Sequence, residues 1–489
     1  MGAHRRCSGR RVKRFSFPSG LILVVLMLAS ITGAGWGAGD SRHVLAQAAG
    51  DWTSLQGGPE HLGTADVDVR PPLRVAWRVG PEGDSRLSAP VVTPSLAVST
   101  GRNSLVGFDP TSGEILWDDL ERAEGPTAPP ALDPSAGSEG ILVFIEGNGP
   151  RDSRLVGVDL SDRARLWEFG LGAQARGAPS IEEGRAFVGT RDREVFAVDV
   201  DSGGELWRAR TQGMVNTAPA LAGGRVFVIA EDETSGRSRL HALDAATGRA
   251  LWGFSPTGVT VGVSSATVAG GMVYAGFGDF TVRGFDAVTG GLRWSTRVRG
   301  PFSAQSTPAF ADGSLFVLDR GGGVYRLDGG TGLRIWDYQF PALATWGAPL
   351  VLDGTVYVGL DDGTTAAIDV DTGHLVWRTR VGLGALGPFA PAGDLLLVSG
   401  LGQRGGVIAF EHDPGGRLVD LPSPTELDLP TALRNFGASF AVMLIALIGL
   451  FRMVVRPRRR IRPSETEGTL PPSGSMVADE PNGNEGQDR

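Results

Sequence analysis

Eight tryptophans recur along the middle of this chain at nearly constant spacing, and this repeat constrains the fold more than any other feature. The intervals between them are 40, 50, 40, 45, 42, 42 and 41 residues. A period in the low forties, with short strand patterns and turn residues inside each unit, is typical of a β-propeller. The eight residues are Trp77, Trp117, Trp167, Trp207, Trp252, Trp294, Trp336 and Trp377.

One unit contains four short β-rich runs, at residues 217–221, 224–230, 239–244 and 249–252. Between the third and fourth runs lies a turn that opens with Asp244 and ends with Gly248. Asp accepts hydrogen bonds from the backbone two residues on, and Gly takes the left-handed conformation that such a turn needs. Similar turns occupy residues 109–113, 199–203, 286–290, 328–332 and 369–373. The copy at 159–163 ends in Arg163, which predicts either a strained turn or one of another shape.

A small residue stands two positions before nearly every turn aspartate. We expect it to provide a flat floor for an indole from a neighbouring blade. The periodicity favours such inter-blade wedges over carbohydrate or quinone stacking as the role of the eight tryptophans. The small residues are Gly107, Gly157, Ala197, Ala242, Gly284, Ala367 and Ala409, and Arg326 is the exception.

Closure of the ring follows from the two ends of the repeat region. After Trp377 the chain supplies strands at 394–399 and 406–411 but no outer strand with a tryptophan. Before the first full unit it supplies a lone strand at 73–77. The N-terminal strand is therefore predicted to complete the last blade of an eight-bladed, all-β propeller, which leaves no unpaired inner edge. The alternative is a seven-bladed ring with an unused eighth fragment.

The repeat resembles that of a known superfamily. The pattern Ala-x-Asp-x-x-Thr-Gly-x-x-x-Trp is unbroken at 242–252 and 367–377, and it resembles the tryptophan-docking repeat of quinoprotein (PQQ-like) propellers. Residues 52–63 look like that family's lead-in segment, so the resemblance covers about residues 51–412. The family includes PQQ-dependent alcohol dehydrogenases, a non-catalytic lipoprotein of outer-membrane protein assembly and many tethered propellers. It implies a fold more firmly than an activity.

Both ends of the chain indicate a membrane. Residues 1–48 read as a signal peptide, cleaved near 32–34 or 46–48, or kept as a signal anchor. Residues 434–455 are apolar and long enough for a transmembrane helix. The basic run that starts at Arg456 predicts a cytoplasmic tail at 456–489, disordered from 463 onward, and an extracytoplasmic propeller joined by a Pro-rich linker at 413–433.

Charge and cysteine content exclude several classes of function. The net charge of the whole chain is −8. Residues 1–14 contribute +6 and residues 452–489 contribute +1, so the net charge of residues 15–451 is −15. Such an acidic domain disfavours nucleic acid as a ligand. Cys7 is the only cysteine, so neither an internal disulfide nor a cysteine-based metal site can form. The six histidines are scattered and stand in no nucleophile motif.

Chemistry, if any, is expected at the face where the loops between blades gather. Two loops there are enlarged, at 146–153 and 231–238. The residues just ahead of the inner strands reach the same face. They supply the candidate cofactor-binding residues Trp346, Arg176, Asn216 and Gln305. In a dehydrogenase Trp346 would stack on the quinone, with Arg176 or Asn216 meeting its carboxylates; otherwise Trp346 plugs the mouth or contacts a partner protein.

The resemblance to alcohol dehydrogenases is incomplete at the residues that carry chemistry. That branch uses two adjacent cysteines beside the quinone and a Ca²⁺ held by Glu and Asn with an Asp base, and no such set can be assigned here. The sequence therefore favours a non-catalytic, membrane-anchored propeller that binds protein partners without a cofactor or a metal. The alternatives are a quinoprotein dehydrogenase with PQQ and Ca²⁺, or a degenerate relative that still binds a cofactor. A sensor that signals through the helix is a third class.

Overall fold

The computed structural model describes residues 51–80, 86–121, 128–137, 139–147, 153–258, 260, 262–302, 306–345, 347–382, 384, 386–400 and 405–418. These residues form strands, turns and loops and no helix. None of them belongs to a helix that could cross a bilayer. The predicted signal region, most of the Pro-rich linker, the transmembrane segment at 434–455 and the tail at 456–489 lie outside the described residues.

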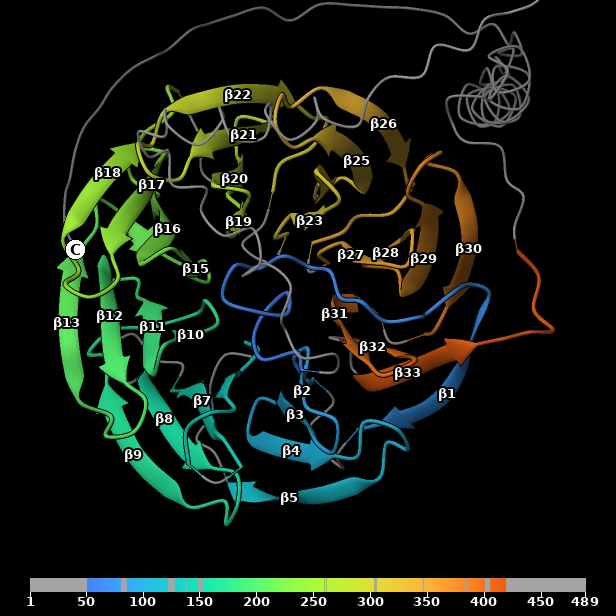
Figure 1. Ribbon diagram of the computed structural model, residues 1–489, viewed down its shortest axis with the longest axis horizontal. Helices are drawn as coiled ribbons and strands as arrows, with labels where there is room; N and C mark the ends of the chain where they lie inside the picture. Colours follow the sequence, from blue (N-terminus) through green and yellow to red (C-terminus); the bar gives the residue numbers. More distant parts are fainter. Residues whose placement is uncertain are drawn as a thin grey trace, which may run out of the picture. The chain divides into compact units, whose positions relative to one another are not determined.

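Thirty-three strands form eight sheets that follow one another around a ring (Figure 1). Each sheet is one blade, with its first strand innermost and its last strand at the rim. Blade 1 is β2 (Val91–Val92), β3 (Ala97–Thr100), β4 (Ser104–Phe108) and β5 (Ile115–Glu121). Blade 2 is β6 (Ala131–Asp133), β7 (Ile141–Glu146), β8 (Arg154–Asp159) and β9 (Arg165–Gly170). Blade 3 is β10 (Ser180–Glu182), β11 (Arg185–Gly189), β12 (Glu194–Asp199) and β13 (Glu205–Arg210).

The next blades repeat this plan, and blade 4 adds a fifth strand, β14 (Met214–Val215). Its other strands are β15 (Ala220–Ala222), β16 (Arg225–Asp232), β17 (Arg237–Asp244) and β18 (Ala250–Phe254). Blade 5 is β19 (Thr267–Ala269), β20 (Met272–Phe277), β21 (Thr281–Asp286) and β22 (Leu292–Arg297). Blade 6 is β23 (Ala309–Ala311), β24 (Ser314–Leu318), β25 (Gly323–Asp328) and β26 (Arg334–Gln339). Blade 7 is β27 (Leu350–Leu352), β28 (Thr355–Gly359), β29 (Thr364–Asp369) and β30 (Leu375–Arg380).

The first strand of the chain closes the ring, as predicted. Blade 8 consists of β31 (Leu386–Ala392), β32 (Leu395–Gly400) and β33 (Gly406–His412), with β1 (Leu73–Val79) as its outer strand. The register of β1 against β33 runs antiparallel from Leu73 opposite His412 to Val79 opposite Val407. The propeller is therefore eight-bladed, and strands from the two ends of the repeat region lie side by side (Figure 1).

Every outer strand contains a β-bulge immediately before its tryptophan. The ladder to the third strand skips one residue there, which is exposed in six blades and partly buried in the other two, at Leu251 and Val376. A bulge on an edge strand also hinders pairing with another chain, because it breaks the regular row of free backbone groups. The skipped residues are Ala76, Leu116, Leu166, Leu206, Leu251, Arg293, Ile335 and Val376.

Each indole is enclosed from two sides, and this corrects the predicted origin of its floor. The small residue before the turn lies under the tryptophan of its own blade, because the two are cross-strand partners. A Cβ built on Gly284 would lie 2.4 Å from the ring of Trp294. The neighbouring blade contributes its turn glycine instead, and a Cβ on Gly332 would also lie 2.4 Å from Trp294. Pattern alone shows which residues are small, but strand register decides which ring they touch.

The same contact repeats around the ring. In six pairs of adjacent blades the turn glycine of the following blade lies against the indole. A Cβ built on that glycine would lie only 2.4–2.7 Å from the nearest ring atom, so only glycine leaves room for the ring. In six pairs the indole Nε1–H also donates to a backbone carbonyl of that blade, at 2.6–3.1 Å. Arg163 replaces the turn glycine that faces Trp117, and it keeps the same left-handed conformation with φ 61°. This turn is therefore strained rather than differently shaped.

The lead-in segment, residues 52–64, lies among the innermost strands of seven blades, and we call it the central segment. Its backbone carbonyls accept hydrogen bonds from inner strands of blades 1, 2, 4, 5, 6 and 7 at 2.7–2.9 Å. The side chain of Gln56 donates to backbone carbonyls of Thr307 and Pro349, at 3.1 and 2.9 Å. Blade 3 is reached through Ser180, whose Oγ lies 3.4 Å from His61 Nε2. The central segment thus joins blades that are far apart in the sequence.

Titratable groups of the central segment are shielded from water. His61 is fully buried, and this burial lowers its pKa to about 4. Its Nδ1 lies 3.0 Å from the carbonyl of Ala266, which can only accept, so the neutral ring carries its proton on Nδ1. Burial, together with the charge of the nearby Glu60, raises the pKa of Glu182, on β10, to about 7. Two carboxyl groups therefore share a poorly solvated place at the inner end of blade 3.

Candidate functional site: the loop face of blades 2 to 4

The two enlarged loops predicted from the sequence lie on the face that carries the connections between blades. The hairpin of β16 and β17 has eight residues in each strand. The strand β14, in the connection from blade 3, pairs with its end, with Met214 opposite Glu231. The other enlarged loop begins after Glu146, at the end of β7, and returns at Arg154. Residues 148–152 of that loop are outside the described part of the chain.

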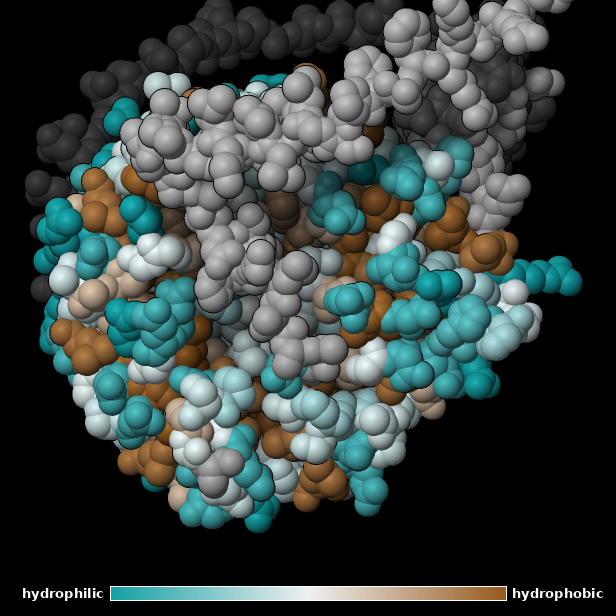
Figure 2. Space-filling model, in the orientation of Figure 1, coloured by the Kyte–Doolittle hydropathy of each residue, from teal (hydrophilic) through white to brown (hydrophobic). Residues whose placement is uncertain are grey.

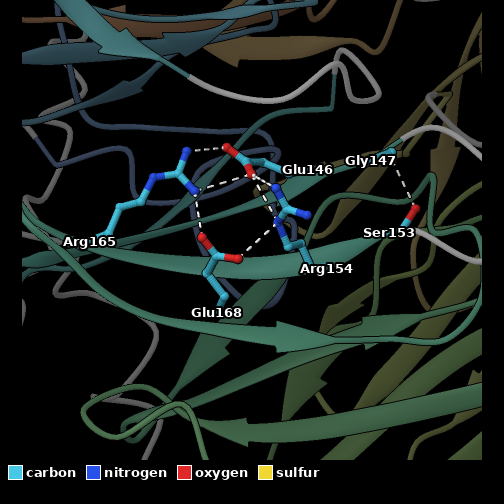
Figure 3. A network of polar contacts seen from close by, with 6 residues as sticks. All are labelled: Glu146, Gly147, Ser153, Arg154, Arg165 and Glu168. Atoms are coloured by element: carbon cyan, nitrogen blue, oxygen red, sulfur yellow. Dashed lines mark hydrogen bonds and ion pairs between the residues drawn. The ribbon is translucent and has the colours of Figure 1, made fainter.

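A buried carboxylate holds the base of the blade 2 loop (Figure 3). Glu146 has no exposed side-chain surface, and two arginines converge on it. Arg154 donates to its Oε2 at 2.9 Å, and Arg165 donates to its Oε1 at 2.5 Å. Glu168, on β9, pairs with the same two arginines at 3.2 and 2.9 Å. A buried carboxylate is stable only when it is paired in this way, so the four side chains fix where the loop leaves the blade.

The hydroxyl of Ser153 continues this arrangement toward blade 3. It donates to the carbonyl of Gly147 at 2.9 Å, across the neck of the loop (Figure 3). The same oxygen accepts from the backbone N–H of Ala175 at 3.2 Å, and the carbonyl of Ser153 accepts from Leu171 at 2.9 Å. The connection between blades 2 and 3 is therefore attached to the loop of blade 2.

Arg191 carries the network from blade 3 to blade 4. Its backbone N–H donates to the carbonyl of Gln174 at 2.8 Å. Its guanidinium donates to Asn216 Oδ1 at 3.3 Å and lies 3.6 Å from Glu233 at the tip of the long hairpin. Asn216 in turn donates to Glu231, and this contact lowers the pKa of that carboxyl against the larger effect of burial, which raises it.

Glu231 links the hairpin to blade 5. Its Oε1 accepts from the backbone N–H of Gly262 at 2.5 Å. Three groups of polar contacts therefore lie along this face, at the base of the blade 2 loop, at the connection between blades 2 and 3, and from Arg191 through Asn216 and Glu231 to Gly262; neighbouring backbone residues connect one group to the next. In the view of Figure 2, hydrophobic residues occur in separate patches among hydrophilic ones.

The predicted cofactor residues are only partly brought together. Asn216 is at the centre of this network, whereas Arg176 is exposed on the connection between blades 2 and 3. Trp346 and Gln305 lie outside the described residues. Sequence reasoning missed Glu146, Arg191 and Glu231. Glu146 had one usable signal, since a carboxylate ends the fully apolar run 141–145.

Two described oxygen-bearing side chains on this face, Asn216 and Glu231, already have partners. The oxygen of Asn216 already accepts from a guanidinium, and an oxygen of Glu231 already accepts from a backbone N–H. The positive charge of Arg191 beside them opposes a cation. Within the described ranges, no group of three or more His, Cys, Asp or Glu side chains could hold a metal ion.

Comparison with known proteins agrees with this architecture. Outer membrane protein assembly factor BamB of Yersinia pestis is 31% identical over 153 residues, which cover 29% of this chain and 38% of that protein. The 1-butanol dehydrogenase (cytochrome c) of Thauera butanivorans is 27% identical over 160 residues, covering 29% of this chain and 23% of that enzyme. The chain thus matches well under half the length of these curated relatives.

Solved structures show the same fold at low sequence identity. The crystal structure of BamB from Moraxella catarrhalis has a TM-score of 0.56 and 19% identity, covering 69% of this chain and 99% of that one. A europium-containing methanol dehydrogenase has a TM-score of 0.58 and 15% identity, covering 74% of this chain and 91% of that one.

A family model described as "Outer membrane protein assembly factor BamB" matches residues 151–304, 236–385 and 281–426. Together these matches extend over more than half of the chain, and they contain the turns, glycines and tryptophans that build blades 3 to 7. The chain therefore belongs to the PQQ_2 family of BamB-like propeller repeats, within the PQQ-like β-propeller superfamily.

Proposed function

We propose that this protein is a protein-binding scaffold whose working surface is the loop face of blades 2 to 4. The observation that carries the proposal is the series of polar contacts from Glu146 to Gly262, which fixes the base of the blade 2 loop and the long hairpin of blade 4. Preorganised loops on a rigid framework lower the ordering cost of binding a partner. Several relatives in this family are named as assembly factors, which is consistent with binding other proteins.

We further propose that the propeller is extracytoplasmic and is held at the membrane by residues 434–455. The support comes from the sequence, where an apolar stretch of bilayer length is followed at once by five arginines in residues 456–462. Protease treatment of intact cells or spheroplasts tests this orientation. We expect fragments of the propeller to be released while a tag at the C-terminus stays protected. Cleavage of the C-terminal tag alone contradicts it.

Site-specific photo-crosslinking tests the scaffold function. A photoreactive residue placed at Glu233, at the exposed tip of the long hairpin, should capture a reproducible partner in membranes. The same residue at Ser202, exposed in the turn 199–203 at the opposite end of a blade, is the matched control. Equal capture at both positions, or no reproducible partner at Glu233, contradicts the proposed surface.

Loosening the hairpin gives a second readout. Arg191→Ala removes the contacts to Asn216 and Glu233 and should weaken capture, because the hairpin then loses its fixed position. Arg249→Ala makes the same charge change in an exposed turn of blade 4 and should leave capture unchanged. The quinoprotein alternative is tested separately by adding PQQ and Ca²⁺. Oxidation of an alcohol or sugar coupled to a dye would overturn the non-catalytic assignment.

A further inference from the structure

A hollow of about 550 Å³ opens in the seam between blades 3 and 4, beside the long hairpin. Its lining is rich in hydroxyl groups and contains two arginines, Arg237 and Arg239, both on β17. The chain after β18 closes one side with residues 255–258, and Gln212 closes the other. Ala230 marks the inner wall, since it packs in one hydrophobic cluster with Trp207 of blade 3.

Arg239 lies in this hollow with part of its hydrogen-bonding capacity unused. Its Nη1 donates to Ser255 Oγ at 3.1 Å, but its buried Nε has no partner. Gly253 provides the room for the guanidinium, since a Cβ there would lie 2.5 Å from Nη2. A buried donor without a partner destabilises the folded state. Such a group in a folded protein therefore needs a reason.

His241 is the next residue on the same face of β17, and it is unpaired as well. Its side chain is 93% buried, with 7% of its surface exposed, and Nε2 has no hydrogen-bond partner. Burial, together with the charge of Arg239, lowers the pKa of His241 to about 4, so the ring is neutral at pH 7. Two neighbouring side chains on this face of β17 thus each have one buried nitrogen without a hydrogen-bond partner.

We propose that this hollow is a binding site for the carboxylate group of a small molecule, anchored by Arg239. A guanidinium edge matches the plane and spacing of a carboxylate, and the pair is strong where water is excluded. The carboxylate would accept from the guanidinium of Arg239, and the remaining atoms of the ligand would lie among the hydroxyl groups of the lining. This inference concerns a small ligand and does not depend on the proposed partner-binding role.

The local charge favours a monoanion. Arg237 and Arg239 contribute two positive charges, and His241 contributes none. Asp232, on the lip, contributes one negative charge, since hydrogen bonds from Ser235 hold the pKa of its carboxyl below its ordinary value. The net charge of the lining is therefore +1, which a carboxylate balances, whereas phosphate carries about −1.5 to −2 at pH 7.

Ligand-induced thermal stabilisation of the purified full-length protein tests the proposal. Sodium acetate, lactate and benzoate are titrated against sodium chloride at equal ionic strength, and sodium phosphate is run in parallel. At least one carboxylate should raise Tm in a saturable way, because a ligand that binds only the folded state stabilises it. Arg239→Gln should weaken that binding at least tenfold, and Arg239→Lys should restore only part of it.

Matched variants separate this site from general effects of charge. Arg249→Gln removes the same charge from an exposed turn of blade 4 and should bind like the unmodified protein. Arg237→Gln, on the exposed lip, provides a second test that does not disturb a buried side chain and should weaken binding severalfold. The proposal is overturned if no carboxylate raises Tm beyond chloride, if Arg239→Gln and Arg249→Gln bind alike, or if phosphate alone binds.

Discussion

Replacing Trp294 with alanine tests the contact that joins adjacent blades. This side chain is 7% exposed and lies between Gly284 of its own blade and Gly332 of the next. Its Nε1–H donates to the carbonyl of Gly329 at 2.9 Å. We therefore expect Trp294→Ala to remove both the packing between blades 5 and 6 and one hydrogen bond across their seam.

The magnitude follows from burial. A buried tryptophan removes roughly 150–250 Å² from water, which at about 25 cal/mol per Å² corresponds to some 4–6 kcal/mol as an upper bound. The carbonyl of Gly329 then loses its partner, and the cavity between two glycine backbones cannot collapse far. Tryptophan-to-alanine changes in such sites cost about 3–5 kcal/mol, and we expect this loss in the free energy of unfolding.

Urea unfolding followed by circular dichroism measures the effect. Trp117→Ala is the matched control, since Trp117 is only half-buried and the following blade has Arg163 at the turn position that is a glycine in six other seams. It should cost about 1 kcal/mol less, because a less buried ring leaves a smaller cavity. The reasoning is refuted if Trp294→Ala loses under about 1 kcal/mol, or if the two variants lose the same amount.

Three further changes probe the turn at Arg163 and the central segment. Arg163→Gly should raise the free energy of unfolding by roughly 0.5–1 kcal/mol. The substitution removes the strain of a left-handed arginine, and this gain exceeds the loss caused by the greater freedom of glycine in the unfolded chain. A lower urea midpoint contradicts this prediction. The pKa of Glu182 is raised to about 7 in the folded protein. Its protonated form therefore stabilises the fold fully below about pH 4.5, and this stabilisation is lost as pH rises through 7. Glu182→Gln should therefore flatten the dependence of Tm on pH between 5 and 8 and stabilise the protein at pH 8 by roughly 1–2 kcal/mol, a figure reduced for partial solvent exposure; an unchanged pH profile speaks against the buried pair. Gln56→Ala leaves two carbonyls of blades 6 and 7 without their donor and should cost about 1–3 kcal/mol in urea unfolding, and no loss would show that water replaces the amide.

The sequence predicts the ring well because its determinants are periodic. The tryptophan spacing and the turns ending in glycine indicated the blades, and the missing outer strand after Trp377 correctly predicted that β1 closes blade 8. The β-bulges were not predicted. A bulge changes which residues oppose one another in the ladder without changing the period of the repeat. The spacing of small residues and tryptophans therefore does not indicate it.

Contacts between blades that are distant in the chain could not be read from the repeat. The central segment was identified only as a lead-in, yet its partners are spread over seven blades. The cluster at Glu146 lies within blade 2 and was missed for another reason, since Arg165 meets that carboxylate across the width of the blade, between strands that are not paired. Of the candidate site, residue types and loop lengths could be predicted, but the pairing of Asn216 with Arg191 and Glu231 depends on how blades 3 and 4 pack against each other.

The pairing of β1 with β33 has a consequence for how this protein can be made. Leu73 pairs with His412, so nearly the whole repeat region must be synthesised before β1 can pair with β33. Until then the strands at both ends of the repeat region lack their partners, and their pairing closes a very long loop. A truncated chain that ends before β33 should accordingly aggregate or be degraded. Deletion of residues beyond β33 should leave the propeller able to fold.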